Sequence, residues 1–171
     1  YLGKLGSSAL GGVGVAISAQ YSVSKLYNDP LLRTSISLVA SSSKEDDKGD
    51  EATKVNANAS RSVSTALLLA LIVGVAQGII YTLGTTTIIQ LMGVSQASDM
   101  YAPATAYLRV RALATPAATL WLVANGIYRG LGNTITPLKY SLMFTTLNAV
   151  LDYIFMFPLR MGAAGAAAGT A

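Results

Sequence analysis

Residues 62–98 read SVSTALLLALIVGVAQGIIYTLGTTTIIQLMGVSQAS, and this stretch contains no charged side chain. About 20 mostly apolar residues are enough for a helix to cross the ~30 Å hydrocarbon layer of a membrane. The whole chain of 171 residues is 52% hydrophobic and only 12% charged, whereas soluble domains typically carry about 25% charged residues. The sequence therefore predicts an all-α integral membrane protein that lies in a lipid bilayer.

The distribution of apolar runs predicts several membrane spans. Between the first two spans, the polar segment 41–60 has the composition of a flexible loop. Lys and Arg favour the cytoplasmic side of a membrane protein. Six of them lie on the side that holds 41–60, and two lie on the other, so we expect this loop to be cytoplasmic. The chain starts without Met, and we expect it to be a fragment. The predicted spans are about 6–40, 61–92, 100–128 and 139–158, with the start of another at 161.

Asp152 is the single charge in the apolar run YSLMFTTLNAVLDYIFMF (140–157). A charge inside a bilayer costs at least a few kcal/mol, so an intramembrane acid suggests a functional site. Asn148 lies four residues earlier, which places both side chains on one face of a helix. This pair predicts a proton or cation site. The alternative is a structural acid held by a neighbouring Arg or hydroxyl.

Arg109 and Arg111 lie in the third predicted span. Two residues along a helix turn the side chain by about 200°, so the two arginines cannot face one cavity. One can pair with Asp152 or attract an anionic substrate, while the other reaches the membrane interface. A structural role is the competing interpretation for each arginine.

The first span carries Lys25, Asp29 and Arg33 at intervals of four residues, so their charges can neutralise one another on one helix face. The triad can either line a cavity or pack as a charge-neutral group between helices. Contact of these charges with lipid is disfavoured. Gln77 and Gln90 are polar residues of the second span. We expect them to make hydrogen bonds between helices.

The composition also excludes several classes of function. The chain has neither Cys nor His, so thiolate metal sites and the usual general bases are missing. No basic cluster with interleaved aromatic residues indicates nucleic acid binding. We predict a protein that is not an enzyme and that has no cofactor or metal.

Six stretches together resemble the multidrug and toxic compound extrusion (MATE) transporters, particularly the plant-type branch that includes citrate exporters and plastid-targeted members. Two positions depart from the family pattern. Tyr153 stands where plant members usually have Pro, and Asn133 replaces an Asp. The stretches that carry the resemblance are SKLYNDPLL (24–32), YLRVRA (107–112), NGIYRG (125–130), GNTITPL (132–138), NAVLD (148–152) and MGAAGAA (161–167).

The resemblance implies that this chain forms helices two to five and the start of helix six. The complete fold would have twelve helices in two six-helix lobes. It also implies export of organic solutes in exchange for protons or sodium. Carried over by position, the coupling site includes Asn148, Asp152 and, less directly, Asn125. The plant-type resemblance favours protons over sodium, and a sodium site would also need more oxygen ligands than Asn148 and Asp152 provide.

The resemblance leaves the cargo and the location open. The substrate is expected to be a citrate-like anion or a cationic xenobiotic. The membrane is expected to be the plasma membrane or the plastid envelope, and the complete protein to act as a monomer. The alternative function is a lipid-linked-sugar flippase of similar fold.

Overall fold

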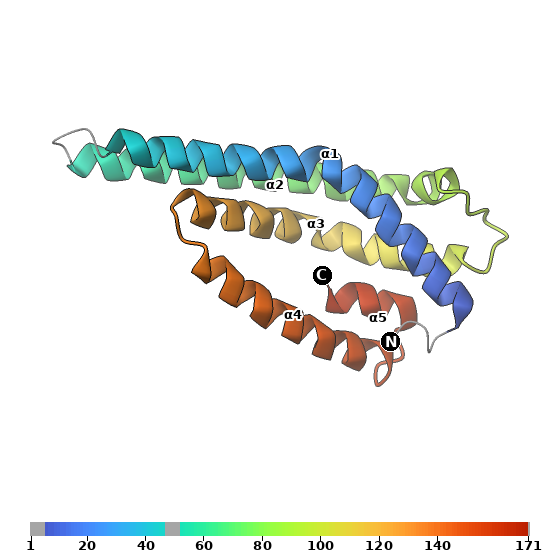
Figure 1. The fold of residues 1–171 in the computed structure, drawn as a ribbon. Coiled ribbons are helices and arrows are strands. Elements are labelled where there is room, and N and C mark those ends of the chain that lie inside the picture. Colours follow the sequence, from blue (N-terminus) through green and yellow to red (C-terminus); the bar gives the residue numbers. More distant parts are fainter. Residues whose placement is uncertain (1–5, 47–51, 171) are drawn as a thin grey trace.

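A computed structural model describes residues 6–46 and 52–170 of the chain, with side chains described at 6–41 and 60–170. Within these ranges the backbone is helical apart from short connections, and no strand occurs. The all-α prediction holds for this part of the chain. The helices, in chain order (Figure 1), are α1 (Ser7–Asp46), α2 (Ala52–Leu91), α3 (Tyr101–Gly130), α4 (Ile135–Met156) and α5 (Gly162–Gly169).

Helices α1 and α2 extend further into the polar segment 41–60 than the sequence predicts. Helix α1 continues to Asp46 and α2 begins at Ala52. Continuing an existing helix adds one hydrogen bond per residue without a new nucleation cost. After Pro30 no Gly or Pro interrupts the chain until Gly49. The helical parts of this segment correct the prediction of an unstructured loop, and residues 47–51 lie outside the described part.

The two long helices α1 and α2 run antiparallel, and α3 lies beneath both of them (Figure 1). Close approach of α2 to α3 depends on two glycines. A Cβ atom at Gly74 would lie 2.8 Å from the Cα of Pro116, and one at Gly78 would lie 3.0 Å from the carbonyl oxygen of Ala112. The small side chains of 62–98 therefore bring the backbones of α2 and α3 together, as in other membrane helix pairs.

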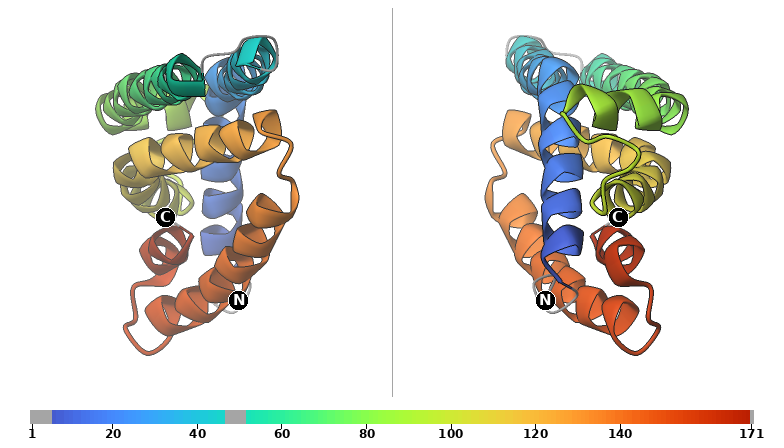
Figure 2. Two further views of the ribbon diagram at one scale, coloured as in Figure 1. Left: turned by 90° about the vertical axis from the view of Figure 1, so that its left-hand side faces the viewer. Right: turned by 90° about the vertical axis from the view of Figure 1, so that its right-hand side faces the viewer.

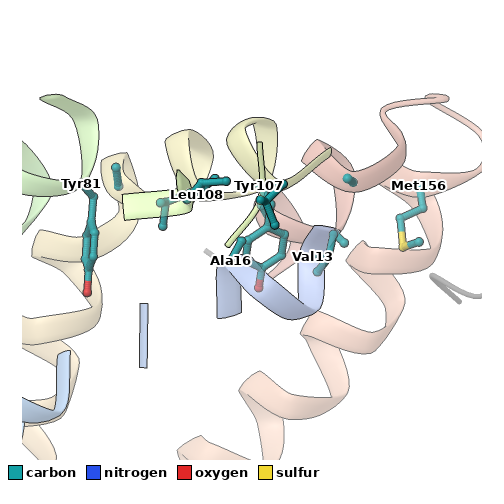
Figure 3. Close-up of a cluster of buried hydrophobic side chains, with 13 residues drawn as sticks. Val13, Ala16, Tyr81, Tyr107, Leu108 and Met156 are labelled. Carbon is teal, nitrogen blue, oxygen red and sulfur yellow. The ribbon is translucent and has the colours of Figure 1, made fainter. Parts of the chain in front are cut away.

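A cluster of buried apolar side chains joins α1, α2 and α3 to the chain around α5. Figure 3 shows this cluster, in which Tyr107 lies beside Ala16 and Val13, while Tyr81 lies at one end and Met156 at the other. Tyr81 and Leu108 are fully buried. The hydroxyl of Tyr81 points out of the apolar cluster (Figure 3) and donates to the carbonyl oxygen of Gln20 at 2.9 Å.

Helices α4 and α5 form a second, smaller unit beside α3 (Figure 2). Helix α4 packs chiefly on α5 and touches α3 little. The connection before α4 is fixed by Asn133, whose Oδ1 accepts from the backbone N–H of Thr136 at 3.0 Å. Most side chains of α4 are exposed, because α4 meets α3 at few points, among them the ring of Trp121 against those of Tyr140 and Phe144.

Among the residues that the structure describes, one segment is long and apolar enough by itself to cross a membrane. This segment is Ser60–Leu91, whose most apolar window of 18 residues has a mean hydropathy of 2.3. It contains the uncharged stretch from which the membrane prediction starts.

Candidate functional site

Asp152 lies on the face of α4 that packs against α5. Its carboxylate oxygen Oδ1 is buried and has no hydrogen-bond partner among the described residues. The approach is close because Gly169 has no side chain: a Cβ there would lie 2.6 Å from the backbone nitrogen of Asp152. A buried carboxylate oxygen without a donor is costly in its ionised form. The packing of α5 on α4 therefore covers this carboxylate oxygen and leaves it without a donor among the described residues.

Asn148 lies one turn before Asp152 and faces the same end of α5. In the amide orientation that suits its neighbours, its nitrogen donates to the carbonyl oxygens of Gly169 (3.1 Å) and Phe144 (3.2 Å). Asn148 also lines a cavity of about 760 Å³. Arg111, Trp121 and Thr170 lie on the wall of the same cavity. The structure thus places Asn148 on the wall of this cavity, one turn before Asp152 on the same helix.

Arg111 is the cationic residue of this cavity. Its Nε donates to the Oε1 of Gln20 at 3.2 Å, and its Nη1 donates to the carbonyl oxygen of Thr170. Within the described ranges no ion pair joins Arg111 to Asp152, so the pairing considered from the sequence is not formed. Arg109 is exposed and lines no described cavity. The two arginines diverge, as their spacing predicts.

Thr170 contributes to the site, although its sequence context does not single it out. It lines the cavity beside Arg111 and Asn148, and its hydroxyl donates to the carbonyl oxygen of Ala166 at 2.9 Å. A lone Thr in a run of Gly and Ala gives little signal in a sequence. Only the packing of α5 between α3 and α4 reveals its position.

The described hydrogen bonds of Asn125 do not connect it to Asn148 or Asp152. Its side-chain nitrogen donates to the carbonyl oxygen of Trp121, one turn earlier on α3, at 2.7 Å. No hydrogen bond joins it to α4 in the described part of the chain. Its predicted role in cation coupling is not tested by this geometry.

The triad Lys25, Asp29 and Arg33 lies exposed on α1, and the described residues show no ion pair within it. A contact between α1 and α2 shows how deep in the membrane-spanning segment the triad lies. Gln77 Nε2 donates to the Oδ1 of Asn28 at 3.1 Å, which sets the triad beside the middle of the uncharged segment of α2. Charges at that depth need water or protein around them.

The side-chain contacts of Gln77 and Gln90 test the expectation that both form hydrogen bonds between helices. Gln77 bonds to Asn28 and so links two helices, as expected. Gln90 is exposed and makes no side-chain hydrogen bond to another helix in the described ranges. The expectation holds for Gln77 and is wrong for Gln90, because Gln90 lies on the outer face of α2.

Comparisons with known proteins identify the family of this helical chain. The family model described as MatE matches residues 53–154. The chain belongs to the MATE family. Its members are membrane transporters, and the MATE chain described here is therefore part of a multi-pass membrane protein.

Two plant proteins illustrate the relationship. The MATE chain is 40% identical over 174 residues to "Protein DETOXIFICATION 44, chloroplastic" of Arabidopsis thaliana, covering 99% of this chain and 33% of the relative. It is 36% identical over 178 residues to "Protein DETOXIFICATION 45, chloroplastic" of the same plant, covering 98% of this chain and 32% of the relative. The chain thus spans about a third of the length of the curated relatives it matches.

Solved structures confirm the fold. A crystal structure of a MATE mutant superposes with a TM-score of 0.73 at 25% identity, covering 99% of this chain and 36% of that one. A crystal structure of MATE in complex with MaD3S gives a TM-score of 0.71 at 24% identity, covering 99% of this chain and 36% of that one. The five described helices are part of the MATE fold.

Proposed function

We propose that the complete protein exports organic solutes in exchange for protons, and that Asp152 is the group that gains and loses the proton. The observation that carries the proposal is the buried Oδ1 of Asp152, which has no hydrogen-bond donor and no cationic partner in the described part of the chain. Proton uptake removes the charge, so the packing of α5 on α4 can respond to the proton.

Asn148 is the partner of this proton site. A side-chain amide can donate to an ionised carboxylate and accept from a protonated one. In the structure its nitrogen donates to the Gly169 carbonyl, which ties the amide to the residue against which Asp152 packs. Movement of α5 would therefore change the surroundings of Asn148 and Asp152 together. Asn125 is a less direct candidate, because its amide is bonded within α3.

Protons suit this arrangement better than sodium. A metal cation of this kind takes about six oxygen ligands when it is bound by protein. The side chains of this pair offer the carboxylate of Asp152 and the amide oxygen of Asn148. We therefore propose proton coupling without a bound metal or other cofactor, and no catalytic role.

The membrane and the cargo belong to the same proposal. Because two of the relatives are named as chloroplastic, the plastid envelope is the first location to examine, with the plasma membrane as the second. The cargo is an organic anion of the citrate type or a cationic xenobiotic. A monomer is the proposed functional unit.

Transport by the full-length protein in proteoliposomes tests the coupling. Wild type, Asp152→Asn and Asp99→Asn are loaded with solute and given an imposed pH gradient. Asp99 is an exposed acid between α2 and α3, so it controls for the loss of one carboxylate. We expect gradient-driven efflux from wild type and Asp99→Asn, and its loss in Asp152→Asn at equal protein insertion. Equal efflux from all three would assign Asp152 a structural role and refute the proposal.

A further inference from the structure

Arg111 connects three helices through its guanidinium group. It lies half-buried on α3. Its Nε donates to the Oε1 of Gln20 on α1 at 3.2 Å, and its Nη1 donates to the carbonyl oxygen of Thr170, the residue that follows α5. The guanidinium group is planar and presents its donors in a rigid fork. A single side chain can therefore hold α1 and the segment 169–170 in a fixed relation to α3.

The adjacent carbonyl of this segment is bonded to α4. Asn148 donates to the carbonyl oxygen of Gly169 at 3.1 Å, whereas the next carbonyl, that of Thr170, accepts from Arg111. A carbonyl oxygen has two lone pairs, so the bond from Arg111 can coexist with a helical hydrogen bond to the same oxygen. Two neighbouring backbone groups are thus held from opposite sides, and the segment 169–170 is fixed between α3 and α4.

The same segment covers the acid of the candidate proton site. The Cβ position of Gly169 overlaps the Oδ1 of Asp152, which is the oxygen that is buried without a hydrogen-bond partner among the described residues. The backbone of Gly169 is therefore what covers this oxygen. Displacement of residues 169–170 would uncover Asp152, so the bond from Arg111 bears on Asp152 without any direct contact between the two side chains.

The partner of Arg111 on α1 is itself held in place. Tyr81 has one hydroxyl proton and donates it to the carbonyl oxygen of Gln20, so Ser24 is the donor in the 2.9 Å bond to the Tyr81 oxygen. Tyr81 is fully buried on α2. The backbone of Gln20 is thereby fixed to α2, while its side chain accepts from Arg111. The guanidinium group is consequently oriented from the three-helix side before it meets Thr170.

Hydrogen bonds are the main constraint at this point, because there is open space beside it. Arg111 and Thr170 both line the cavity of about 760 Å³ and a second cavity of about 440 Å³ between α1, α2 and α3. A region with few packed neighbours opens at a low cost in free energy. Loss of one hydrogen bond from a charged group should therefore change the position of residues 169–170 measurably.

We propose that Arg111 is a positioning residue of the candidate proton site, which holds residues 169–170 over Asp152 and joins them to α1. This inference rests on the proposed function for its meaning in transport, since it concerns the same carboxylate. Arg111 acts through the backbone of α5 and not through an ion pair with Asp152. Movement of α5 at Asp152 would accordingly be transmitted to α1 through Arg111 and Gln20.

Carbodiimide labelling of the purified full-length protein in detergent tests the proposal without a cargo or a pH gradient. N,N′-dicyclohexylcarbodiimide enters apolar regions and adds to protonated carboxyl groups, and mass spectrometry gives the rate at Asp152. At one fixed pH we expect labelling to be about tenfold faster in Arg111→Gln than in wild type, the scale on which one charge-assisted hydrogen bond shifts an opening equilibrium. Asp152→Asn should lose this label, which identifies the modified group.

Three further variants separate the contacts of Arg111 from its charge. Arg109→Gln removes the same charge from the exposed face of α3 and should leave the rate unchanged. Arg111→Lys keeps the charge but not the planar fork, so it should label nearly as fast as Arg111→Gln. Gln20→Leu removes the acceptor on α1 and should also speed labelling. Equal rates in wild type and Arg111→Gln, a similar increase in Arg109→Gln, or wild-type behaviour of Arg111→Lys would overturn the proposal.

Hydrogen exchange distinguishes a local change from a general loss of structure. The amide hydrogens of residues 163–170 should exchange faster in Arg111→Gln, whereas those of residues 62–74 in α2 should exchange as in wild type. Faster exchange in both segments would mean that Arg111 supports the whole bundle, which contradicts a positioning role. If Arg111→Gln does not fold, the labelling rate of Gln20→Leu decides the question, because this variant leaves Arg111 in place.

The two proposals fail in different ways. If both are right, Arg111→Gln should also lower gradient-driven efflux at equal protein insertion. If Asp152→Asn loses efflux while Arg111→Gln labels at the wild-type rate, the proton coupling stands and the positioning role is wrong. If Arg111→Gln labels faster while Asp152→Asn transports normally, Arg111 positions the segment and the assignment of the proton to Asp152 is wrong.

Discussion

Replacing Gly169 by alanine tests the packing that buries Asp152. A Cβ at Gly169 would lie 2.6 Å from the backbone nitrogen of Asp152 and 2.9 Å from its Cα. Backbone atoms cannot move aside as the end of a side chain can, so α5 must shift away from α4. Such overpacking costs about 1–3 kcal/mol. The better helix propensity of alanine offsets at most about 1 kcal/mol of that cost.

Gly14→Ala is the matched control for this change. Gly14 lies within α1, and a Cβ there would have no neighbour within 4 Å. This variant should gain the helix propensity without the clash, so the difference between the variants isolates the overpacking. We expect the free energy of unfolding to be about 1–3 kcal/mol lower in Gly169→Ala than in Gly14→Ala.

Two measurements on the full-length protein check this prediction. Unfolding in detergent gives the stability difference, and gradient-driven efflux from proteoliposomes gives the effect on coupling. We expect both to fall in Gly169→Ala and neither to fall in Gly14→Ala. Equal stability of the two variants would refute the close packing of α5 on Asp152. A loss of stability with normal efflux would show that this packing does not position the proton site.

The charged face of α1 and the turn before α4 carry two further predictions. In a full-length protein without other cysteines, Lys25→Cys and Arg33→Cys should react with a membrane-impermeant thiol reagent. Leu83→Cys, on the apolar surface of α2, should not react. Unreactive cysteines at both α1 positions would mean that protein or lipid covers the triad. Asn133→Ala should lower stability by about 1 kcal/mol, because the acceptor for the Thr136 N–H is lost. Asn133→Asp should retain stability in the same unfolding assay, and equal losses in both variants would contradict this role.

Much of the fold follows from the sequence because membrane helices are constrained locally. An uncharged run such as 62–98 must satisfy its backbone hydrogen bonds within a helix, whatever its neighbours are. Gly74 and Gly78 indicate a close contact, and the structure identifies α3 as the partner. The ends of the helices were less predictable. The polar residues 41–46 indicated a loop, whereas no Gly or Pro among them stops a helix that has already formed.

From the sequence alone it follows that Asp152 and Asn148 share a helix face and that Arg109 and Arg111 diverge, because both statements depend only on the helical repeat. Tertiary structure decided which groups surround them. Asp152 meets Gly169 rather than Arg111, and the partner of Gln77 is Asn28. These contacts join residues far apart in the chain, and helix packing sets them through the shapes of whole surfaces. No local pattern of residues encodes such a match.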